Sequence, residues 1–374
     1  MSLIKKAILY FAILLLYNCS SKKNVLEKVL ATDNEKIKEV IKNSKQYELQ
    51  IIYTQIVRDK GKITFKDYTY NLDASNYYYP ASTIKFPIAI LALEKLNTIE
   101  NTSVNSIYTI EGSSEKLKFA DEITKVFAVS DNVASSNLFE FTGFDYINQK
   151  MKEKGLEPFR ISHRLSGSEP SNPLVKSVTL YKDNGSIEVF PSKLNEKSAT
   201  LELNNLIKGT GFIKGDQLVN EPFDFSKKNY YPLETLHNTL KRIVFPEAFN
   251  ESERFKITDK EREFILFSMQ NLPRNAGYNP KEYYDSYCKF FMFGDTKNQI
   301  PDNIKIYNKI GQAYGTMTET AYIIDTENKV EFMLSATILV NKDGIFNDGV
   351  YEYNSVSLPF FAALGRELYA KSKM

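Results

Sequence analysis

A serine and a lysine at the start of a long apolar stretch have the types and spacing needed for nucleophilic chemistry. Ser82 and Lys85 stand three positions apart, and the apolar stretch behind them runs to Leu93. Residues at this spacing lie on one face of a helix, so the Lys85 amine is expected one turn from the Ser82 hydroxyl. A desolvated lysine with a lowered pKa can take the proton of a serine, which is otherwise a weak nucleophile. The alternative is a helix serine beside a lysine that extends its ammonium to solvent.

Two later tripeptides make this pair part of a larger pattern. Ser130-Asp131-Asn132 follows an apolar tripeptide, and Lys309-Ile310-Gly311 precedes Gln312 and a strand-like segment. The order S-x-x-K, S-D-N, K-[ST]-G is the signature of class A β-lactamases and penicillin-binding proteins. The chain therefore resembles the class A β-lactamase-like serine hydrolases, over roughly residues 45 to 370 and with a divergent middle.

The resemblance implies roles for these residues. Ser82 would attack a carbonyl, Lys85 would accept its proton, and Ser130 would relay a proton to the leaving group under the influence of Lys309. The residues expected to bind substrate are Asn132, Gly311, Gln312 and Thr316. Asn132 would bond the substrate amide, and the backbone N–H groups of Ser82 and Gln312 would hold the oxyanion. The resemblance implies no cofactor and no metal, and two histidines with one free cysteine make a poor zinc set.

Two positions depart from the family pattern. The Ω-loop match reads Arg164-Leu165-Ser166, so Ser166 stands where class A enzymes carry a deacylating glutamate. Glu169 follows three residues later and is either a replacement base or a solvated loop carboxylate. Ile310 replaces a Ser or Thr that offers its hydroxyl to a substrate carboxylate, for which Thr316 or Thr318 is the remaining candidate. We therefore expect deacylation to be slow and binding of a substrate carboxylate to be weak.

The fold that the resemblance implies is α+β, with an antiparallel sheet built from both chain ends, flanked by the terminal helices and packed on an all-α domain. The sheet domain would comprise residues 33–81 and 294–374, and the helical domain residues 82–293 with an insertion at about 166–232. Periodicity and turn residues predict a hairpin of strands 47–57 and 62–71, and another on Asp183-Asn184-Gly185. Helices are predicted at 33–45, 121–129, 233–245 and 259–269, with caps at Asp33 and at Thr258 or Asp259. The C-terminal part is predicted as a strand over 308–325, a strand over 330–340 and a helix over 358–371.

The first residues indicate export. Residues 1–18 contain Lys5, Lys6 and a short apolar run, which is typical of a signal peptide. The end of this run, Leu16-Tyr17-Asn18-Cys19, is similar to a bacterial lipobox, so we expect lipidation of Cys19 and a tether over 19–32. The alternatives are an uncleaved anchor and an ordinary secretory signal. The protein is thus expected in the bacterial cell envelope, lipid-anchored and facing the periplasm or the outer surface.

Composition limits the partners. The net charge is only +2 and the charges are interspersed, so nucleic acid is not an expected partner. Cys288 is the one cysteine besides Cys19, and we expect it to be a small buried hydrophobe.

Three functions follow from the sequence. The first is a serine acyl hydrolase of β-lactamase type that acts on a β-lactam or a related amide or ester. The second is a penicillin-binding, D-alanyl peptidase-like acyltransferase on cell-wall peptides, which the missing Ω-loop glutamate and the enlarged middle favour. The third is a non-enzymatic cell-wall-binding lipoprotein, against which the five polar residues Ser82, Lys85, Ser130, Asn132 and Lys309 argue.

Overall fold

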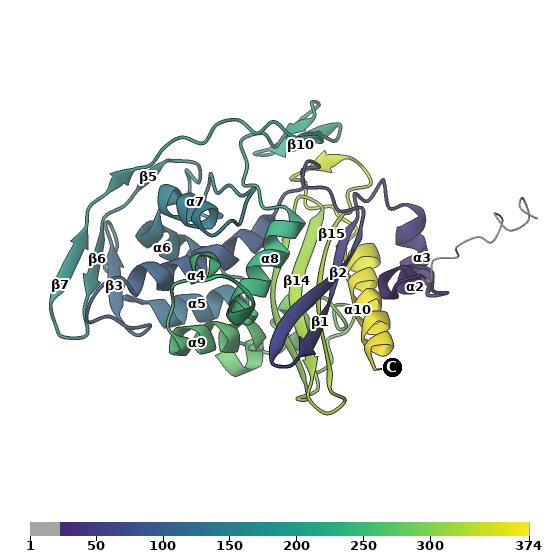
Figure 1. Ribbon diagram of the computed structural model, residues 1–374. Helices are drawn as coiled ribbons and strands as arrows, with labels where there is room; N and C mark the ends of the chain where they lie inside the picture. Colours follow the sequence, from purple (N-terminus) through teal and green to yellow (C-terminus); the bar gives the residue numbers. More distant parts are fainter. Residues whose placement is uncertain (1–22, 374) are drawn as a thin grey trace, which may run out of the picture.

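A five-stranded antiparallel sheet forms the centre of the protein, in a computed structural model that describes residues 23–373. The strand order is β13-β14-β15-β1-β2 (Figure 1). The strands are β1 (Gln50–Asp59), β2 (Lys62–Tyr70), β13 (Ile304–Ala313), β14 (Thr316–Asp325) and β15 (Val330–Leu339). β1 pairs with β15, with Tyr53 opposite Leu334, so the two chain ends share one sheet. The predicted α+β fold with such a sheet is confirmed.

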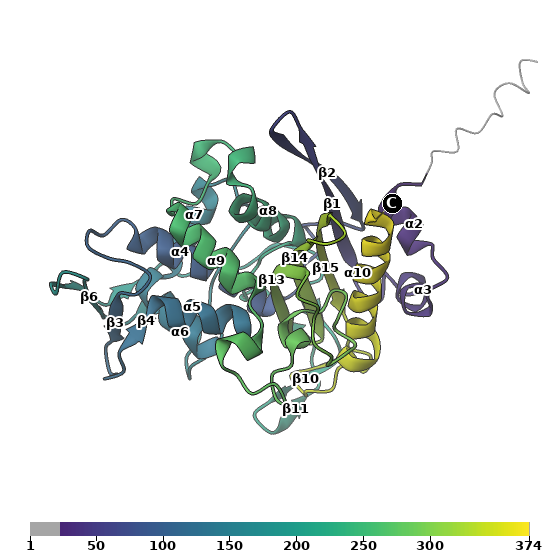
Figure 2. The same cartoon turned by 90° about the horizontal axis from the view of Figure 1, so that it is seen from below.

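Helices from both chain ends cover one face of this sheet. They are α2 (Val25–Leu30), α3 (Glu35–Lys42) and α10 (Leu358–Ser372), and Figure 2 shows them side by side. Side chains alternate along β15, so Leu334 joins the core under these helices while Met333 joins the core on the opposite face. The predicted cap of the first long helix was wrong by one residue. Asn34, not Asp33, accepts the backbone N–H of Lys36 at 3.1 Å.

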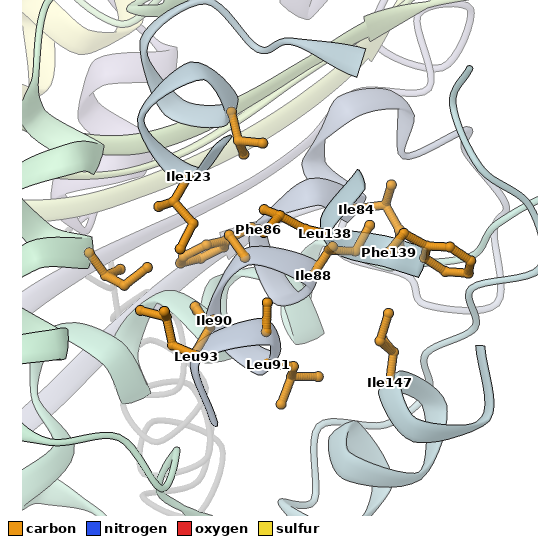
Figure 3. Packing of buried hydrophobic residues seen from close by; sticks show 14 of the residues in the cluster. Ile84, Phe86, Ile88, Ile90, Leu91, Leu93, Ile123, Leu138, Phe139 and Ile147 are labelled. Atoms are coloured by element: carbon orange, nitrogen blue, oxygen red, sulfur yellow. The ribbon is translucent and has the colours of Figure 1, made fainter. Parts of the chain in front are cut away.

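A layer of helices covers the other face. It contains α4 (Lys85–Leu96), α5 (Phe119–Ala128), α6 (Asn132–Thr142), α7 (Phe144–Glu153), α8 (Leu233–Val244) and α9 (Asp259–Gln270). In α4, every residue except Lys95 is buried, because this helix is apolar on all sides and lies within the layer. Figure 3 shows Phe86 and Ile88 of α4 among Ile123 of α5 and Leu138 of α6. The apolar stretch after Ser82 is thus core, as predicted.

Short strands complete the structure. They are β3 (Ile107–Ile110), β4 (Leu117–Lys118), β5 (Leu174–Val175), β6 (Val178–Tyr181), β7 (Ile187–Phe190), β8 (Lys193–Leu194), β9 (Ile207–Lys208), β10 (Gly211–Lys214), β11 (Gln217–Val219), β12 (Phe223–Asp224) and β16 (Ile345–Phe346). The predicted hairpin on Asp183-Asn184-Gly185 is confirmed as β6 and β7, which join β3 and β4 in one sheet. β10 pairs in parallel with β16, which ties the middle of the chain to the loop after β15.

The C-terminal strands differ from the prediction in one respect. Residues 308–325 are not one strand but the hairpin of β13 and β14, which turns at Tyr314 and Gly315. Both turn residues have positive φ, +52° and +73°, as a two-residue type I′ turn requires. A tyrosine rarely occupies such a position, so the turn was not recognised in the sequence.

The predicted signal peptide and Cys19 lie outside the described residues. Within residues 23–373, no helix combines the length and the apolar character needed to cross a membrane.

Candidate active site

Ser82 lies in a tight turn that packs against the edge strand β13. The 3₁₀ turn Ala81–Ile84 precedes α4, so Ser82 stands just before the α-helix, at the start of the apolar stretch. Ala81 has a φ of +47°, a strained backbone directly before the serine. A Cβ atom at Gly311 would lie 2.6 Å from the carbonyl oxygen of Pro80, so only glycine lets β13 approach this turn. Gly311 thus allows close packing of β13 against the turn that carries Ser82. It is not part of the lining of either cavity described below.

Lys85, the first residue of α4, points into the loop between α5 and α6. Its side chain is fully buried, and Nζ donates to the carbonyl oxygen of Ser130 and to Asn132 Oδ1 at 2.6 Å. Nζ is also 3.4 Å from Ser130 Oγ, whereas no hydrogen bond to the Ser82 hydroxyl is present among the described residues. Burial and then the nearby charge of Lys309 hold the pKa of Lys85 well below its ordinary value. The neutral, proton-accepting form of Lys85 is therefore easier to reach than that of an ordinary lysine.

Ser130 receives hydrogen bonds from a second lysine. Lys309 Nζ donates to Ser130 Oγ at 2.8 Å and to the carbonyl oxygen of Ile310 at 2.9 Å. Burial lowers the pKa of Lys309 to about 8. Since Lys309 donates to Ser130 Oγ, the hydroxyl hydrogen of Ser130 is available to another group in the cleft. Asp131 serves the local structure, because its carboxylate accepts the N–H of Ala134 at 2.8 Å and caps α6.

Two cavities meet at Ser82, and both also include Asn132 and Gln312 in their linings. The Ser130-side cavity, about 390 Å³, extends from Ser130 and Ile310 to an aromatic segment over residues 284–290. The Tyr314-side cavity, about 560 Å³, extends to Leu165, Tyr314 and the loop over residues 347–351. The serine thus has open space on two sides, one of them next to Ser130.

The register of β13 directs the backbone N–H of Gln312 toward Ser82. Ala313 pairs with Thr316 across a two-residue turn, and this closing pair is hydrogen-bonded in such hairpins. Gln312, one residue earlier, is then in a non-hydrogen-bonded pair, so its N–H points away from β14 to the free edge. The Ser82 turn packs on this edge. The register therefore leaves the Gln312 N–H without a partner in β14, on the edge of β13 that faces the Ser82 turn.

The two threonines considered as replacements for the missing hydroxyl do not reach the cleft. Thr316 is 4% exposed and lines neither cavity. Thr318 is fully buried and shares a 2.7 Å hydrogen bond with Thr337 Oγ1. Ile310 itself lines the Ser130-side cavity with an apolar side chain.

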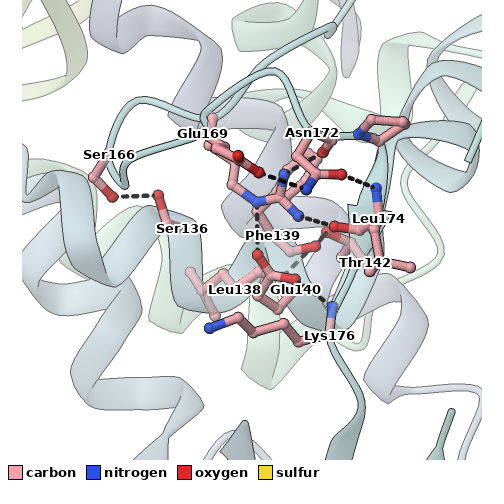
Figure 4. A network of polar contacts seen from close by, with 12 residues as sticks. Ser136, Leu138, Phe139, Glu140, Thr142, Ser166, Glu169, Asn172, Leu174 and Lys176 are labelled. Carbon is pink, nitrogen blue, oxygen red and sulfur yellow. Dashed lines mark hydrogen bonds and ion pairs between the residues drawn. The ribbon is translucent and has the colours of Figure 1, made fainter. Parts of the chain in front are cut away.

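The Ω-loop segment places a hydroxyl, not a carboxylate, near Asn132. Ser166 Oγ is 2.7 Å from Ser136 Oγ (Figure 4) and 3.3 Å from the carbonyl oxygen of Asn132. Glu169 instead accepts from Asn172 Nδ2 at 3.0 Å and lines a separate cavity that does not include Ser82. Glu169 in this position is a loop carboxylate, and the structure gives no support to it as a replacement base.

An ion pair fixes the start of this loop. Arg164 Nε donates to Glu140 Oε1 at 2.6 Å, and the same carboxylate accepts the N–H of Lys176 at 2.7 Å. Arg164 also donates to the carbonyl oxygens of Asn172 and Leu174. These bonds tie the loop to α6 and hold Leu165 at the Tyr314-side cavity.

Several cleft residues were not identified from the sequence. Tyr79 and Tyr314 lie within three residues of the serine and lysine motifs, and the others come from segments far from all three motifs: Tyr284, Tyr287, Tyr351 and Asn354. Cys288 also lines the Ser130-side cavity and is 3% exposed, so the prediction that it is a buried residue is confirmed. Only Tyr314 carried a sequence signal, because it lies next to Gly315 after the lysine motif.

Comparisons with known proteins agree with the fold described above. The family model described as Beta-lactamase enzyme family matches residues 34–200. A class A β-lactamase from Bacteroides cellulosilyticus matches with a TM-score of 0.54 at 11% identity, over 93% of this chain and 98% of that one. A β-lactamase from Xanthomonas campestris matches with a TM-score of 0.51 at 13% identity, over 93% and 98%. One from Mycobacterium abscessus, of class A, matches with 0.50 at 11%, over 89% and 98%. No curated protein matches the chain in sequence.

Proposed function

We propose that this chain, whose residues 34–200 match the β-lactamase family model and whose fold is similar to class A β-lactamases, is a serine hydrolase that forms an acyl-enzyme through Ser82. One observation carries the proposal. Lys85, Ser130, Asn132 and Lys309 form a connected set of hydrogen bonds beside Ser82, although they come from separate parts of the chain. Burying two lysine amines costs free energy, and a protein without chemistry at this site would have no use for them.

Acylation would begin with proton transfer to Lys85. A neutral lysine has two N–H groups and one lone pair, and the oxygens of Ser130 and Asn132 are acceptors for the two N–H groups. The lone pair is then free to take the proton of Ser82 as its oxygen attacks the carbonyl carbon. Negative charge on the carbonyl oxygen would be held by the N–H groups of Ser82 and Gln312, as in other preorganised oxyanion sites.

Departure of the leaving group would use Ser130. Its hydroxyl hydrogen passes to the leaving nitrogen or oxygen, and Lys85 returns the proton taken from Ser82 to Ser130. The Lys309 ammonium, 2.8 Å from Ser130 Oγ, stabilises negative charge on that oxygen during the transfer. Asn132, which lines both cavities, is the candidate for bonding the acyl amide.

Loss of the acyl group is proposed to be slow. Hydrolysis needs a base that activates water, typically worth about 10²–10⁴-fold in rate. Ser166 offers only a hydroxyl at the Ω-loop position, and Ser166 and Glu169 both line a cavity that does not include Ser82. Asp348, a carboxylate in the lining of the Tyr314-side cavity, belongs to an exposed loop and accepts the N–H of Val350.

The slow loss of the acyl group proposed above also agrees with a second candidate function. An acyl-enzyme that water attacks slowly persists long enough to pass its acyl group to an amine. The alternative is therefore a penicillin-binding, D-alanyl peptidase-like acyltransferase on cell-wall peptides. We retain for both candidates the proposal that Cys19 carries a lipid and that the protein acts in the bacterial cell envelope.

A time course of intact mass with penicillin tests these proposals. Addition of one penicillin mass that is lost over hours supports slow deacylation, and faster loss with an added amino-acid acceptor supports the acyltransferase. Rapid turnover without accumulation supports an efficient β-lactamase instead. No covalent adduct with penicillin or with a simple activated ester would contradict both candidates and favour a non-enzymatic wall-binding protein.

A further inference from the structure

The Ser130-side cavity has an aromatic and apolar wall. Its lining includes Tyr284, Tyr287, Phe290, Ile310 and Leu358, together with uncharged polar side chains such as Asn354 and Gln312. Tyr287 packs edge-on against Tyr284, with ring centroids 6.0 Å apart. Burial raises the pKa of Tyr287, so this phenol stays neutral at the pH of ordinary media. The Ser286 hydroxyl is already used, because it donates to the carbonyl oxygen of Thr296.

A buried polar network holds this wall in place. Asn308 Nδ2 donates to the carbonyl oxygen of Cys288 at 2.7 Å, and the N–H of Phe291 donates to Glu319 Oε2 at 2.6 Å. Lys289 turns its ammonium away from the cavity, to Asn308 Oδ1 and the carbonyl oxygen of Met269. The charge of Lys289 is therefore not available to a ligand, although the neighbouring Cys288 lines the cavity.

Positive charge is scarce on both sides of Ser82. Among the described residues, no lysine, arginine or histidine lines either cavity, and the lining has one charged side chain, Asp348. Lys297 lies near the wall, with Nζ 5.0 Å from the centre of the Tyr284 ring, but is not part of the lining. Lys309 donates to Ser130 and to Ile310. A carboxylate in the Ser130-side cavity would lack a cation in the lining and the hydroxyl that Ile310 replaces, both of which would offset its desolvation.

From these contacts we infer that the leaving group of the substrate is neutral and aromatic or apolar, not carboxylate-bearing. This inference rests on the proposed acyl transfer at Ser82, because Ser130 identifies the cavity next to it as the leaving-group side. An aryl or alkyl ester, or an amide of an uncharged amine, has the matching chemistry. Tyr284, Tyr287 and Ile310 are then the residues that determine specificity.

A matched pair of esters tests the inference. Phenyl phenylacetate and its meta-carboxyphenyl analogue deliver the same acyl group and differ only in a carboxylate on the leaving phenol. We expect the second-order rate constant of acylation to be at least about tenfold higher for the phenyl ester. This factor corresponds to the loss of about one hydrogen bond to a charged group. Phenol release and intact mass measure the rate. Equal rates, or faster reaction of the carboxylate ester, would overturn the inference.

Asn354 offers a way to change the preference. This exposed residue lines the Ser130-side cavity, so Asn354→Arg adds a guanidinium without disturbing the core. The variant should lower the ratio of the acylation rate constants of the two esters about fivefold. Asn354→Gln, which is uncharged, should leave this ratio as in the wild type. An unchanged ratio in Asn354→Arg would contradict the idea that missing positive charge sets the preference.

Different results would contradict the proposed function and this inference. Release of both phenols that persists in Ser82→Ala would contradict acylation at Ser82, and so would a failure of both esters to acylate the wild type. Both results would remove the inference as well. Acylation of Ser82 by both esters at equal rates would leave the proposed function standing and overturn the inference alone.

Discussion

Lys309 Nζ donates a 2.8 Å hydrogen bond to Ser130 Oγ, although 179 residues separate them in the sequence. Lys309 belongs to the edge strand β13, and Ser130 to the loop between α5 and α6, where its φ of +57° is in the left-handed region. The bond thus joins the sheet to the helical layer beside Ser82. The charge state of Lys309 in this bond is the first property to test.

The acylation rate should fall as the pH rises through about 8. Burial lowers the pKa of Lys309 to about 8, so its ammonium is present below this pH and lost above it. The charged form is the one that stabilises Ser130, so activity is lost on the alkaline side. Lys309→Gln should acylate about 10²-fold more slowly and lack this alkaline limb. The measurement is the acylation rate of wild type and variant on both sides of pH 8, and an alkaline limb retained by the variant would assign the titration to another group.

Ser82→Ala should abolish covalent modification by penicillin or an activated ester. The proposed nucleophile is removed, while the turn and α4 keep their packing, so the melting temperature should change little. Intact mass and peptide mapping check the modification, and circular dichroism checks the fold. Adducts that persist in the folded variant, or that map to another serine, would show that Ser82 is not the nucleophile.

Ser166→Glu should speed loss of the acyl group by at least about tenfold, because it supplies a carboxylate near Asn132 that can activate water. Glu169→Gln and Asp348→Asn are the controls and should leave deacylation as in the wild type. The measurement is the decay of the acyl-enzyme mass after excess ester is removed. Deacylation that is already fast and that slows in either control would identify that carboxylate as the base.

Gly311→Ala should impair acylation more than stability. The new Cβ would lie 2.6 Å from the carbonyl oxygen of Pro80 and 3.0 Å from the backbone nitrogen of Thr83, so the Ser82 turn must move away from β13. A shift of the serine relative to the Gln312 N–H should slow acylation about tenfold or more, since acyl transfer depends on the placement of oxyanion donors. Acylation and thermal unfolding are measured together. An unchanged acylation rate would mean that this close approach does not position the serine.

Natively expressed protein should partition into detergent and lose its first 18 residues through processing at Cys19. The lysines, the short apolar run and the following cysteine are the basis of this expectation. Cell fractionation and mass spectrometry of the N-terminus check it, with Cys19→Ser as the matched variant. A Cys19→Ser protein with the same mobility and membrane fraction would contradict lipidation.

Local sequence was sufficient for much of the fold. The hairpin of β1 and β2 follows from two strand-like runs around a glycine turn, and the buried α4 follows from its unbroken apolar stretch. The order of the three motifs led to the correct α+β fold. These features depend on neighbours within a few residues, or on a pattern whose members are recognisable one by one.

The sequence determined by itself which side chains are available to the chemistry: Ser82, Lys85, Ser130 and Lys309, with a serine at position 166 and an isoleucine at position 310. Only the tertiary structure decided that Lys85 donates to Ser130 and Asn132, that Glu169 lies in another cavity, and that Tyr284 and Tyr287 form a wall beside Ser130. The type I′ turn at Tyr314 and Gly315, which fixes the register of β13, was also decided there. Such contacts join residues far apart in the chain, and they are set by strand register and by packing of the helical layer on the sheet, which local periodicity does not encode.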